Sequence, residues 1–499
     1  MISICVINIP TGGVMFSKKL TLQLMVYMKL VAGTLLLTLN TANAANDGIG
    51  TAISIESAIE KAQRNDPWLT GNVHKQQAIE SMSMAVSTLP DPTISIGLAN
   101  LPTNGFDFGQ EGMTQAKVGI SQMFPRGDTL EIKRQQLKTE SEAFPYQRQD
   151  RESKVAVIVG NLWLDTYRVQ QSIFLIEKNR TLFEQLVDVA DASYSSGIGK
   201  TRQQDIVRAQ LELTRLEERL DRLAQQKSGY EGMLLQWLTD VSDKKSVQNE
   251  GYHESSFVLH DIKLSSELPK VDFVNRDLVF KNSWLRPSEL VKYIANHPAL
   301  VAIDKKVKAT KTGIRLAQQK YQPAWGVIAS YGYRADDPMG NSRADLFSVG
   351  VTFDLPLFTE NRQDKEVKSA ISNTEAIKTE KLLLMRKLLA SYASAKGRLL
   401  RLKDRQNLYT SKLIPQTHDQ AEASLTAYTN DDGDFAEVVR SRIAVLNAEI
   451  DELTLNVEEQ KLLLELNYFF INSIHPVKKI RQSNVSNKRD YTDISGEKQ

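Results

Sequence analysis

Alternation of apolar and polar residues marks two places in the chain as strand pairs, and each pair is followed by a long stretch with helical periodicity. After Pro92, the residues Ile94, Ile96 and Leu98 share one face, and a second run follows a loop rich in Gly and Asn. The apolar positions of the other runs are Ala116, Val118 and Ile120 in the first place, and Trp325, Val327, Ala329, Tyr331 and Tyr333, then Phe347, Val349, Val351, Phe353 and Leu355, in the second.

Each alternating run is about ten residues long, the length that a tilted strand needs to cross the hydrocarbon of a bilayer. One face is aromatic and aliphatic and the other is small and polar, which suits lipid on one side and water on the other. The same alternation is also typical of a half-buried strand in a soluble sandwich. Taken alone, the strands slightly favour a soluble sandwich. Together with the helical regions described next, they favour a membrane-spanning sheet.

The helical stretches predict long coiled coils. Short amphipathic helices over residues 54–64 and 288–295 precede the strand pairs, and Pro145 is the only proline in residues 128–192. At about 1.5 Å per residue, an uninterrupted helix there would reach roughly 100 Å. Apolar residues of the returning limbs follow a heptad spacing, so the helices are expected to pack through apolar seams. The seam residues are Leu213, Leu216, Leu220 and Leu223, then Ile443, Leu446, Ile450, Leu453 and Val457.

The same landmarks occur twice at a constant offset. Asn65-Asp66-Pro67 recurs as Asn296-His297-Pro298, and Val118-Gly119-Ile120 recurs as Val349-Gly350-Val351. The offsets 298 − 67 and 349 − 118 both equal 231, which indicates one supersecondary unit used twice. We expect a first repeat over residues 45–239, a linker or equatorial segment over 240–286, a second repeat over 287–472, and a disordered tail over 473–499.

Residues 1–44 have the pattern of a signal peptide, with an apolar run after Lys29 and Ala42-Asn43-Ala44 at the expected cleavage site. Cys5 is the only cysteine and lies in this segment, so the mature chain would contain no disulfide and no thiolate site. Cleavage would remove three lysines, leaving 62 − 3 = 59 basic against 60 acidic residues. That balance argues against a nucleic-acid partner.

The sequence shows no catalytic constellation. Its six histidines are scattered without metal-ligand spacing, and neither a phosphate-binding glycine loop nor a nucleophile motif is present. We therefore predict that the protein is not an enzyme and has no cofactor. Four methionines could act as soft Cu(I) ligands, but packing is the more common role, so no bound metal is predicted. They are Met82, Met84, Met113 and Met123.

Residues 54–470 resemble the TolC-like outer-membrane efflux ducts in segment order and in one hairpin tip. The first tip, Tyr194-Ser195-Ser196-Gly197 followed by Asp205-Ile206-Val207-Arg208-Ala209-Gln210, fits the tip pattern of that family. The second tip has Tyr428, but Asp431 stands where Gly is usual and Ser441 where Ala is usual. Residues 91–102 and 122–127 resemble the heavy-metal-efflux branch.

The resemblance implies a mixed α/β membrane protein, in which four strands per chain contribute to a trimeric 12-stranded β-barrel in the outer membrane. Long helical hairpins would form a tunnel across the periplasm of a Gram-negative-type cell. The implied partners are two further copies of the chain, a periplasmic adaptor (membrane fusion) protein, an inner-membrane efflux pump and outer-membrane lipid. The implied function is passive export of copper, silver or drugs. The alternatives are the duct of a type I protein-secretion system and a periplasmic coiled-coil scaffold without a pore.

The hairpin tips are the candidate periplasmic gate. Acids repeated in three copies around a narrow opening would favour cations, although Asp-rich turns also occur for backbone reasons. In the family, an acidic residue sits where Glu437 falls, and a second acid falls where this chain has Arg440, so that charge is either lost or replaced by an ion pair. The candidates are Tyr194, Asp205, Arg208, Tyr428, Asp431, Asp432, Asp434, Glu437 and Arg440.

Overall fold

The computed structural model describes residues 52–196, 202–239, 263–272, 286–430 and 432–471. The expected signal peptide and tail lie outside the described residues, as do most of the expected linker, Gly197 and Asp431. The chain divides into a unit Met1–Ala52 and a unit Ile53–Gln499. The description below concerns the second unit.

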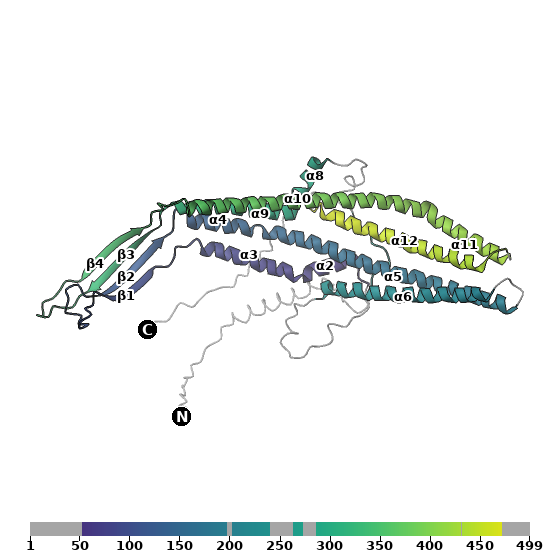
Figure 1. The fold of residues 1–499 in the computed structure, drawn as a ribbon, viewed down its shortest axis with the longest axis horizontal. Coiled ribbons are helices and arrows are strands. Elements are labelled where there is room, and N and C mark those ends of the chain that lie inside the picture. Colours follow the sequence, from purple (N-terminus) through teal and green to yellow (C-terminus); the bar gives the residue numbers. More distant parts are fainter. Residues whose placement is uncertain (1–51, 197–201, 240–262, 273–285, 431, 472–499) are drawn as a thin grey trace, which may run out of the picture. The chain divides into compact units, whose positions relative to one another are not determined.

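The two halves of this unit contain the same series of elements, a short helix, a second helix, a strand pair and long helices (Figure 1). The first half consists of α2 (Ile55–Asn65), α3 (Pro67–Ala85), β1 (Thr93–Ala99), β2 (Gln115–Phe124), α4 (Thr129–Ser141), α5 (Phe144–Ser196) and α6 (Gln203–Leu238). The second half consists of α8 (Pro287–Ile294), α9 (Pro298–Gln318), η2 (Gln319–Tyr321), β3 (Trp325–Tyr333), β4 (Leu346–Phe353), α10 (Gln363–Leu408), the π-helical η3 (Tyr409–Leu413), α11 (Ile414–Thr429) and α12 (Phe435–Tyr468).

The four strands form one antiparallel sheet in the order β1-β2-β3-β4, so β2 of the first half pairs with β3 of the second. The register aligns apolar residues across all four strands in one row: Ile96, Val118, Tyr331 and Phe347. The neighbouring row is small and polar: Ser95, Gly119, Ser330 and Ser348.

The apolar face of the sheet is open to solvent in the single chain. Ile96 is 82% exposed and Phe347 is 72% exposed. A sandwich strand would have its apolar face covered by a second layer, so the soluble-sandwich alternative does not describe this sheet. The predicted alternation is confirmed, and the face that it produces has no cover from the described part of the chain.

The long helices pack side by side through the predicted seams. α5 packs against both α6 and α12, and α11 packs against α12 (Figure 1). Leu216 and Leu223 of α6 are buried in the same cluster as Leu446 and Ile450 of α12, which confirms the heptad prediction. The two hairpins therefore share one apolar core near their turns. None of the helices in the described ranges is both long and apolar enough to span a bilayer.

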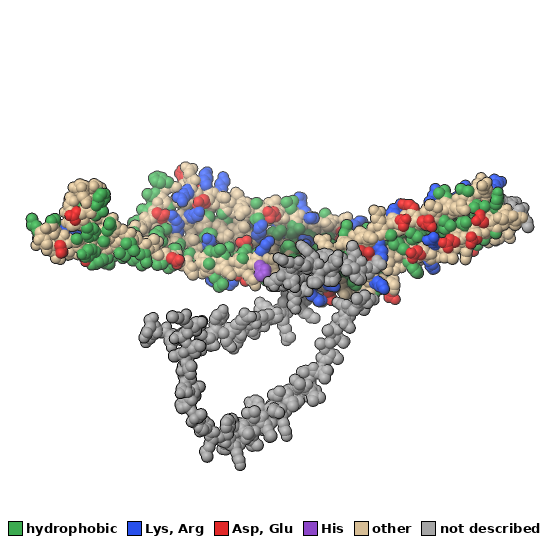
Figure 2. All heavy atoms as spheres, turned by 90° about the horizontal axis from the view of Figure 1, so that it is seen from below, with side chains coloured by type: hydrophobic (Ala, Val, Ile, Leu, Met, Phe, Trp, Pro, Cys, Tyr) green, Lys and Arg blue, Asp and Glu red, His purple; other side chains and the backbone are tan. Residues whose placement is uncertain are grey.

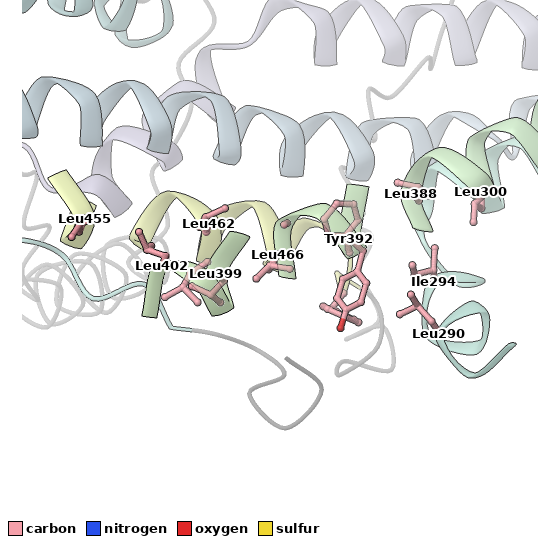
Figure 3. Packing of buried hydrophobic residues seen from close by; sticks show 14 residues of the cluster. Leu290, Ile294, Leu300, Leu388, Tyr392, Leu399, Leu402, Leu455, Leu462 and Leu466 are labelled. Carbon is pink, nitrogen blue, oxygen red and sulfur yellow. The ribbon is translucent and has the colours of Figure 1, made fainter. Parts of the chain in front are cut away.

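A second buried apolar cluster joins α8, α10 and α12. Leu399 and Leu402 of α10 pack with Leu462 and Leu466 of α12 (Figure 3). Tyr392 meets Phe470 edge to face, with ring centroids 5.5 Å apart. The remaining buried members include Leu290 and Ile294 of α8, so this short helix is anchored on α10. From the expected equatorial segment, Leu264 forms a single parallel bridge with Ile53.

One expectation about the helices is wrong. The uninterrupted helix expected over residues 128–192 is broken between Ser141 and Phe144, where Pro145 enters the first turn of α5. Proline has no N–H and its ring clashes with the preceding turn, so it begins a helix more readily than it continues one. The 53 residues of α5 therefore span roughly 80 Å at about 1.5 Å each.

The short helices end within one residue of the expected bounds, α2 at Asn65 and α8 at Ile294. Pro67 and Pro298 then each open a further helix, α3 or α9, that the sequence pattern did not predict. The residue before each proline caps the new helix: Asp66 Oδ1 accepts from the Trp68 N–H at 3.0 Å, and His297 Nδ1 accepts from the Ala299 N–H at 3.3 Å. Burial lowers the pKa of His297, which favours the neutral ring that this acceptor role requires.

Candidate functional site

At the first hairpin tip, Asp205 is buried and Arg208 is exposed. Asp205 is only 4% exposed, and its Oδ2 accepts from the Arg202 N–H at 2.9 Å, so the carboxylate caps the start of α6. Its Oδ1 has no hydrogen-bond partner in the described structure. Arg208, one turn later, is exposed and forms no ion pair with a described residue, and Tyr194 at the end of α5 is exposed too.

The second tip is ordered by a cap and an aromatic contact. Asp434 Oδ1 accepts from the Ala436 N–H at 3.1 Å and so caps α12. The ring of Tyr428 meets that of Phe435 edge to face at 5.5 Å, and the Phe435 side chain is buried. Asp432 is exposed, and its backbone N–H donates to the Ala427 carbonyl at 2.9 Å. Asp434 therefore has a structural role, while the Asp432 carboxylate is free to face a partner or solvent.

Glu437 and Arg440 form an ion pair within one turn of α12. The other oxygen of Glu437 accepts from Gln420 Nε2 of α11 at 3.4 Å. Of the two outcomes considered from the sequence, loss of the second acid or its replacement by an ion pair, the structure shows the ion pair. Because both side chains are substantially exposed, the pair contributes at most about 1 kcal/mol to stability.

The structure brings the two tips together through apolar residues and not through the charged candidates. Ala209 and Leu216 of α6 share a buried cluster with Phe435 and Val438 of α12. No ion pair in the described ranges joins a charged candidate of the first tip to one of the second. The sequence did not indicate that Asp205 and Asp434 cap helices, Asp205 as a buried residue and Asp434 as an exposed one. An Asp in the first turn of a helix, or just before it, is the signal that could have revealed it.

Replacing Gly433 by Ala should loosen the second tip. An added Cβ would lie 2.6 Å from the Tyr428 nitrogen and 2.8 Å from the Ala427 carbonyl carbon, and backbone atoms cannot move aside cheaply. Such overpacking costs about 1–3 kcal/mol. We expect faster proteolytic cleavage at the tip in a limited-digestion time course, because cleavage follows local opening. Gly229→Ala on α6, whose Cβ would meet nothing within 4 Å, is the control and should not accelerate cleavage. Equal cleavage of both variants would contradict the tight turn.

Metal ligands do not gather anywhere in the described ranges: no group of three or more His, Cys, Asp or Glu side chains could hold an ion. The four methionines considered as packing or copper ligands are 49–67% exposed. Gap-filling in the core is therefore the wrong interpretation of Met82, Met84, Met113 and Met123 in the single chain.

The fold matches those of solved outer-membrane channels. The outer-membrane channel OprN superposes with a TM-score of 0.65 at 13% identity, covering 83% of this chain and 89% of that chain. The outer-membrane protein VceC of Vibrio cholerae gives 0.64 at 13%, covering 83% and 95%. CusC, described in terms of transmembrane channel formation, gives 0.63 at 13%, covering 83% and 91%.

No protein-family model and no curated protein matches the sequence. At such low identity the structural matches show a shared fold, and at that level they confirm the resemblance drawn from residues 54–470.

Proposed function

We propose that this chain, which has the fold of solved outer-membrane channels, is the outer-membrane duct of a tripartite efflux system. The observation that carries the proposal is the sheet, which has one face that is apolar in every strand and open to solvent, while the opposite face is mostly small and polar. Lipid is the environment that makes such an exposed face favourable, because apolar surface in water is costly.

Three copies of the chain would close the barrel. Both β1 and β4 are edge strands of the sheet, and each has only one partner strand among those described. Unpaired backbone groups at an edge are not tolerated in hydrocarbon, and four strands are too few for a barrel, since the smallest known have about eight. A homotrimer would supply 3 × 4 = 12 strands and pair β4 of one copy with β1 of the next.

The helical hairpins would form the periplasmic tunnel, with the tips as its gate. α5 and α6 connect at one tip and α11 and α12 at the other, and within this unit both tips lie at the end opposite the strands (Figure 1). Exposed Asp432 and Arg208 are then available for polar links between neighbouring copies or to an adaptor. The field of the repeated acids would favour cations entering the duct.

The duct would be passive, with energy supplied by an inner-membrane pump and transfer by a periplasmic adaptor. The cargo we propose is small and toxic, such as copper or silver ions or drugs. Support for metal ions comes from residues 91–102 and 122–127, which resemble the heavy-metal-efflux branch.

Deletion of the gene should lower survival on copper and silver, or on dyes, and a plasmid copy should restore it. Growth would be compared across copper, silver, zinc and dye gradients, with the secreted proteins profiled in parallel. Unchanged tolerance together with the loss of a secreted protein would favour the type I secretion alternative. Recovery of the protein in the soluble fraction without detergent would favour the scaffold and refute the duct.

A further inference from the structure

The strands join the helices at a junction built from both halves of the chain. Arg126, just after β2, donates through Nη1 to the Gln322 carbonyl at 2.8 Å and forms an ion pair with Asp354, just after β4. Gly127 has a positive φ of 44°, and a Cβ there would lie 2.3 Å from Gln319 Oε1. The junction is therefore a tightly specified piece of backbone, and it would lie at the periplasmic face of the membrane if the proposed function is right.

A cavity of about 420 Å³ opens at this junction. The side chains that line the cavity include four cations and one carboxylate, that of Glu366. Two of the cations already have partners, since Arg126 pairs with Asp354 and Lys320 Nζ lies 2.9 Å from Glu366 Oε2. The other two, Lys133 and Arg362, are exposed and make no side-chain hydrogen bond or ion pair with a described residue. The cavity thus has two uncompensated positive charges.

A buried amide lines the same cavity without a partner. Gln363, the first residue of α10, is only 7% exposed, and its Oε1 accepts no hydrogen bond within the described structure. A buried acceptor without a donor is unfavourable, so its presence beside a cavity points to a ligand that donates. The start of α10 lies at the same point, where Asp364 and Glu366 in the first turn already offset the helix dipole, so the attraction for an anion comes from the two free cations.

Exposed apolar side chains occupy the segment that joins the sheet to α10, whose first residue, Gln363, lines the cavity. Phe353 at the end of β4, and Leu355, Leu357 and Phe358 between β4 and α10, are all exposed. Figure 2 shows hydrophobic side chains gathered over the end that holds the strands, with Lys and Arg side chains grouped on the adjoining helices. A molecule with an anionic head, an N–H donor and acyl chains would satisfy all three features.

We propose that the cavity binds the headgroup of an aminophospholipid such as phosphatidylethanolamine. Its phosphate lies against Lys133 and Arg362 at the start of α10, its ammonium donates to Gln363 Oε1, and its acyl chains lie along the apolar residues after β4. The site rests on the proposed membrane position of the sheet.

Binding would be measured on the full-length protein in detergent by native mass spectrometry, with dihexanoyl-phosphatidylethanolamine as the probe. The double variant Lys133→Gln/Arg362→Gln should weaken binding about thirtyfold, because each basic group near a lipid phosphate contributes roughly a factor of five. The matched control Lys138→Gln/Lys368→Gln, on the same two helices outside the cavity, should leave binding unchanged. Equal affinity of wild type and the cavity variant would overturn the inference.

A second variant tests the role of the amide. Dihexanoyl-phosphatidylcholine has no N–H on its headgroup, so wild type should bind it less tightly than phosphatidylethanolamine. Gln363→Met should abolish the preference for phosphatidylethanolamine over phosphatidylcholine while keeping the affinity for the phosphate. If this variant keeps the preference, Gln363 does not contact the headgroup. Inorganic phosphate that competes as well as the lipid would show a free-phosphate site and refute lipid binding. These measurements do not depend on export, so their failure would leave the duct proposal to be judged by fractionation and survival.

Discussion

An arginine at Val349 should prevent the chain from accumulating as a membrane trimer, whereas an arginine at the neighbouring Ser348 should be tolerated. Val349 lies in the apolar row with Ala329, and Ser348 lies in the polar row with Ser330. An Arg on the lipid face at mid-membrane costs about 2–4 kcal/mol, and three copies would bring this to about 6–12 kcal/mol per trimer. That is comparable to the whole stability of a typical folded domain.

The measurement is the amount of SDS-resistant, heat-dissociable trimer in the outer-membrane fraction. Both residues are exposed in the single chain, so neither arginine meets a packed neighbour there. The pair of variants therefore compares only the two faces of one strand. Equal amounts of trimer from Val349→Arg and Ser348→Arg would show that the apolar face does not contact lipid.

Removing both tip arginines, Arg208→Ala with Arg440→Ala, should raise single-channel conductance in planar bilayers. Arg208 is exposed and forms no ion pair with a described residue, so it is available to a neighbouring copy, and Arg440 holds Glu437 in place. Each exposed link contributes about 0.2–1 kcal/mol, so three Arg208 links in a trimer would hold the gate shut by about 0.6–3 kcal/mol. Their loss should increase the open population roughly threefold or more.

The control for this experiment removes equivalent arginines away from the tips. Arg401 forms an i,i+3 ion pair with Asp404 on α10, which matches the spacing of Glu437 with Arg440, and Arg222 lies on α6 as Arg208 does. Arg222→Ala with Arg401→Ala should leave conductance at the wild-type value. Wild-type conductance in the tip variant as well would place the constriction elsewhere in the duct.

Local periodicity was enough to predict much of this fold. The alternation at Val349 and Phe347 defines two strand faces whatever the strand pairs with, because successive side chains point to opposite sides. The heptad spacing through Leu216 and Leu446 likewise places those residues on one helix face, and burial follows once a second helix is present.

Context decided what local pattern left open. An Asp at position 205 is compatible with a side chain that faces a channel and with one that caps a helix. Only the fold shows that Asp205 is buried and accepts a hydrogen bond from the Arg202 N–H. Met82 and Met123 could have been core residues, and only the packing shows them exposed. Pro67 opens α3 directly after α2 ends, and no pattern in the sequence indicated that helix or its cap by Asp66.

The sequence by itself therefore determined the repeat, the faces of the strands and the seams of the helices, because each depends on spacing between near neighbours. Only the tertiary structure decided that β2 pairs with β3 across the two halves, that Arg126 reaches Asp354, and that Gln363 is buried beside unpaired cations. The contact of Arg126 with Asp354 joins residues 228 positions apart, and no local period along a chain encodes which distant residue will be the partner.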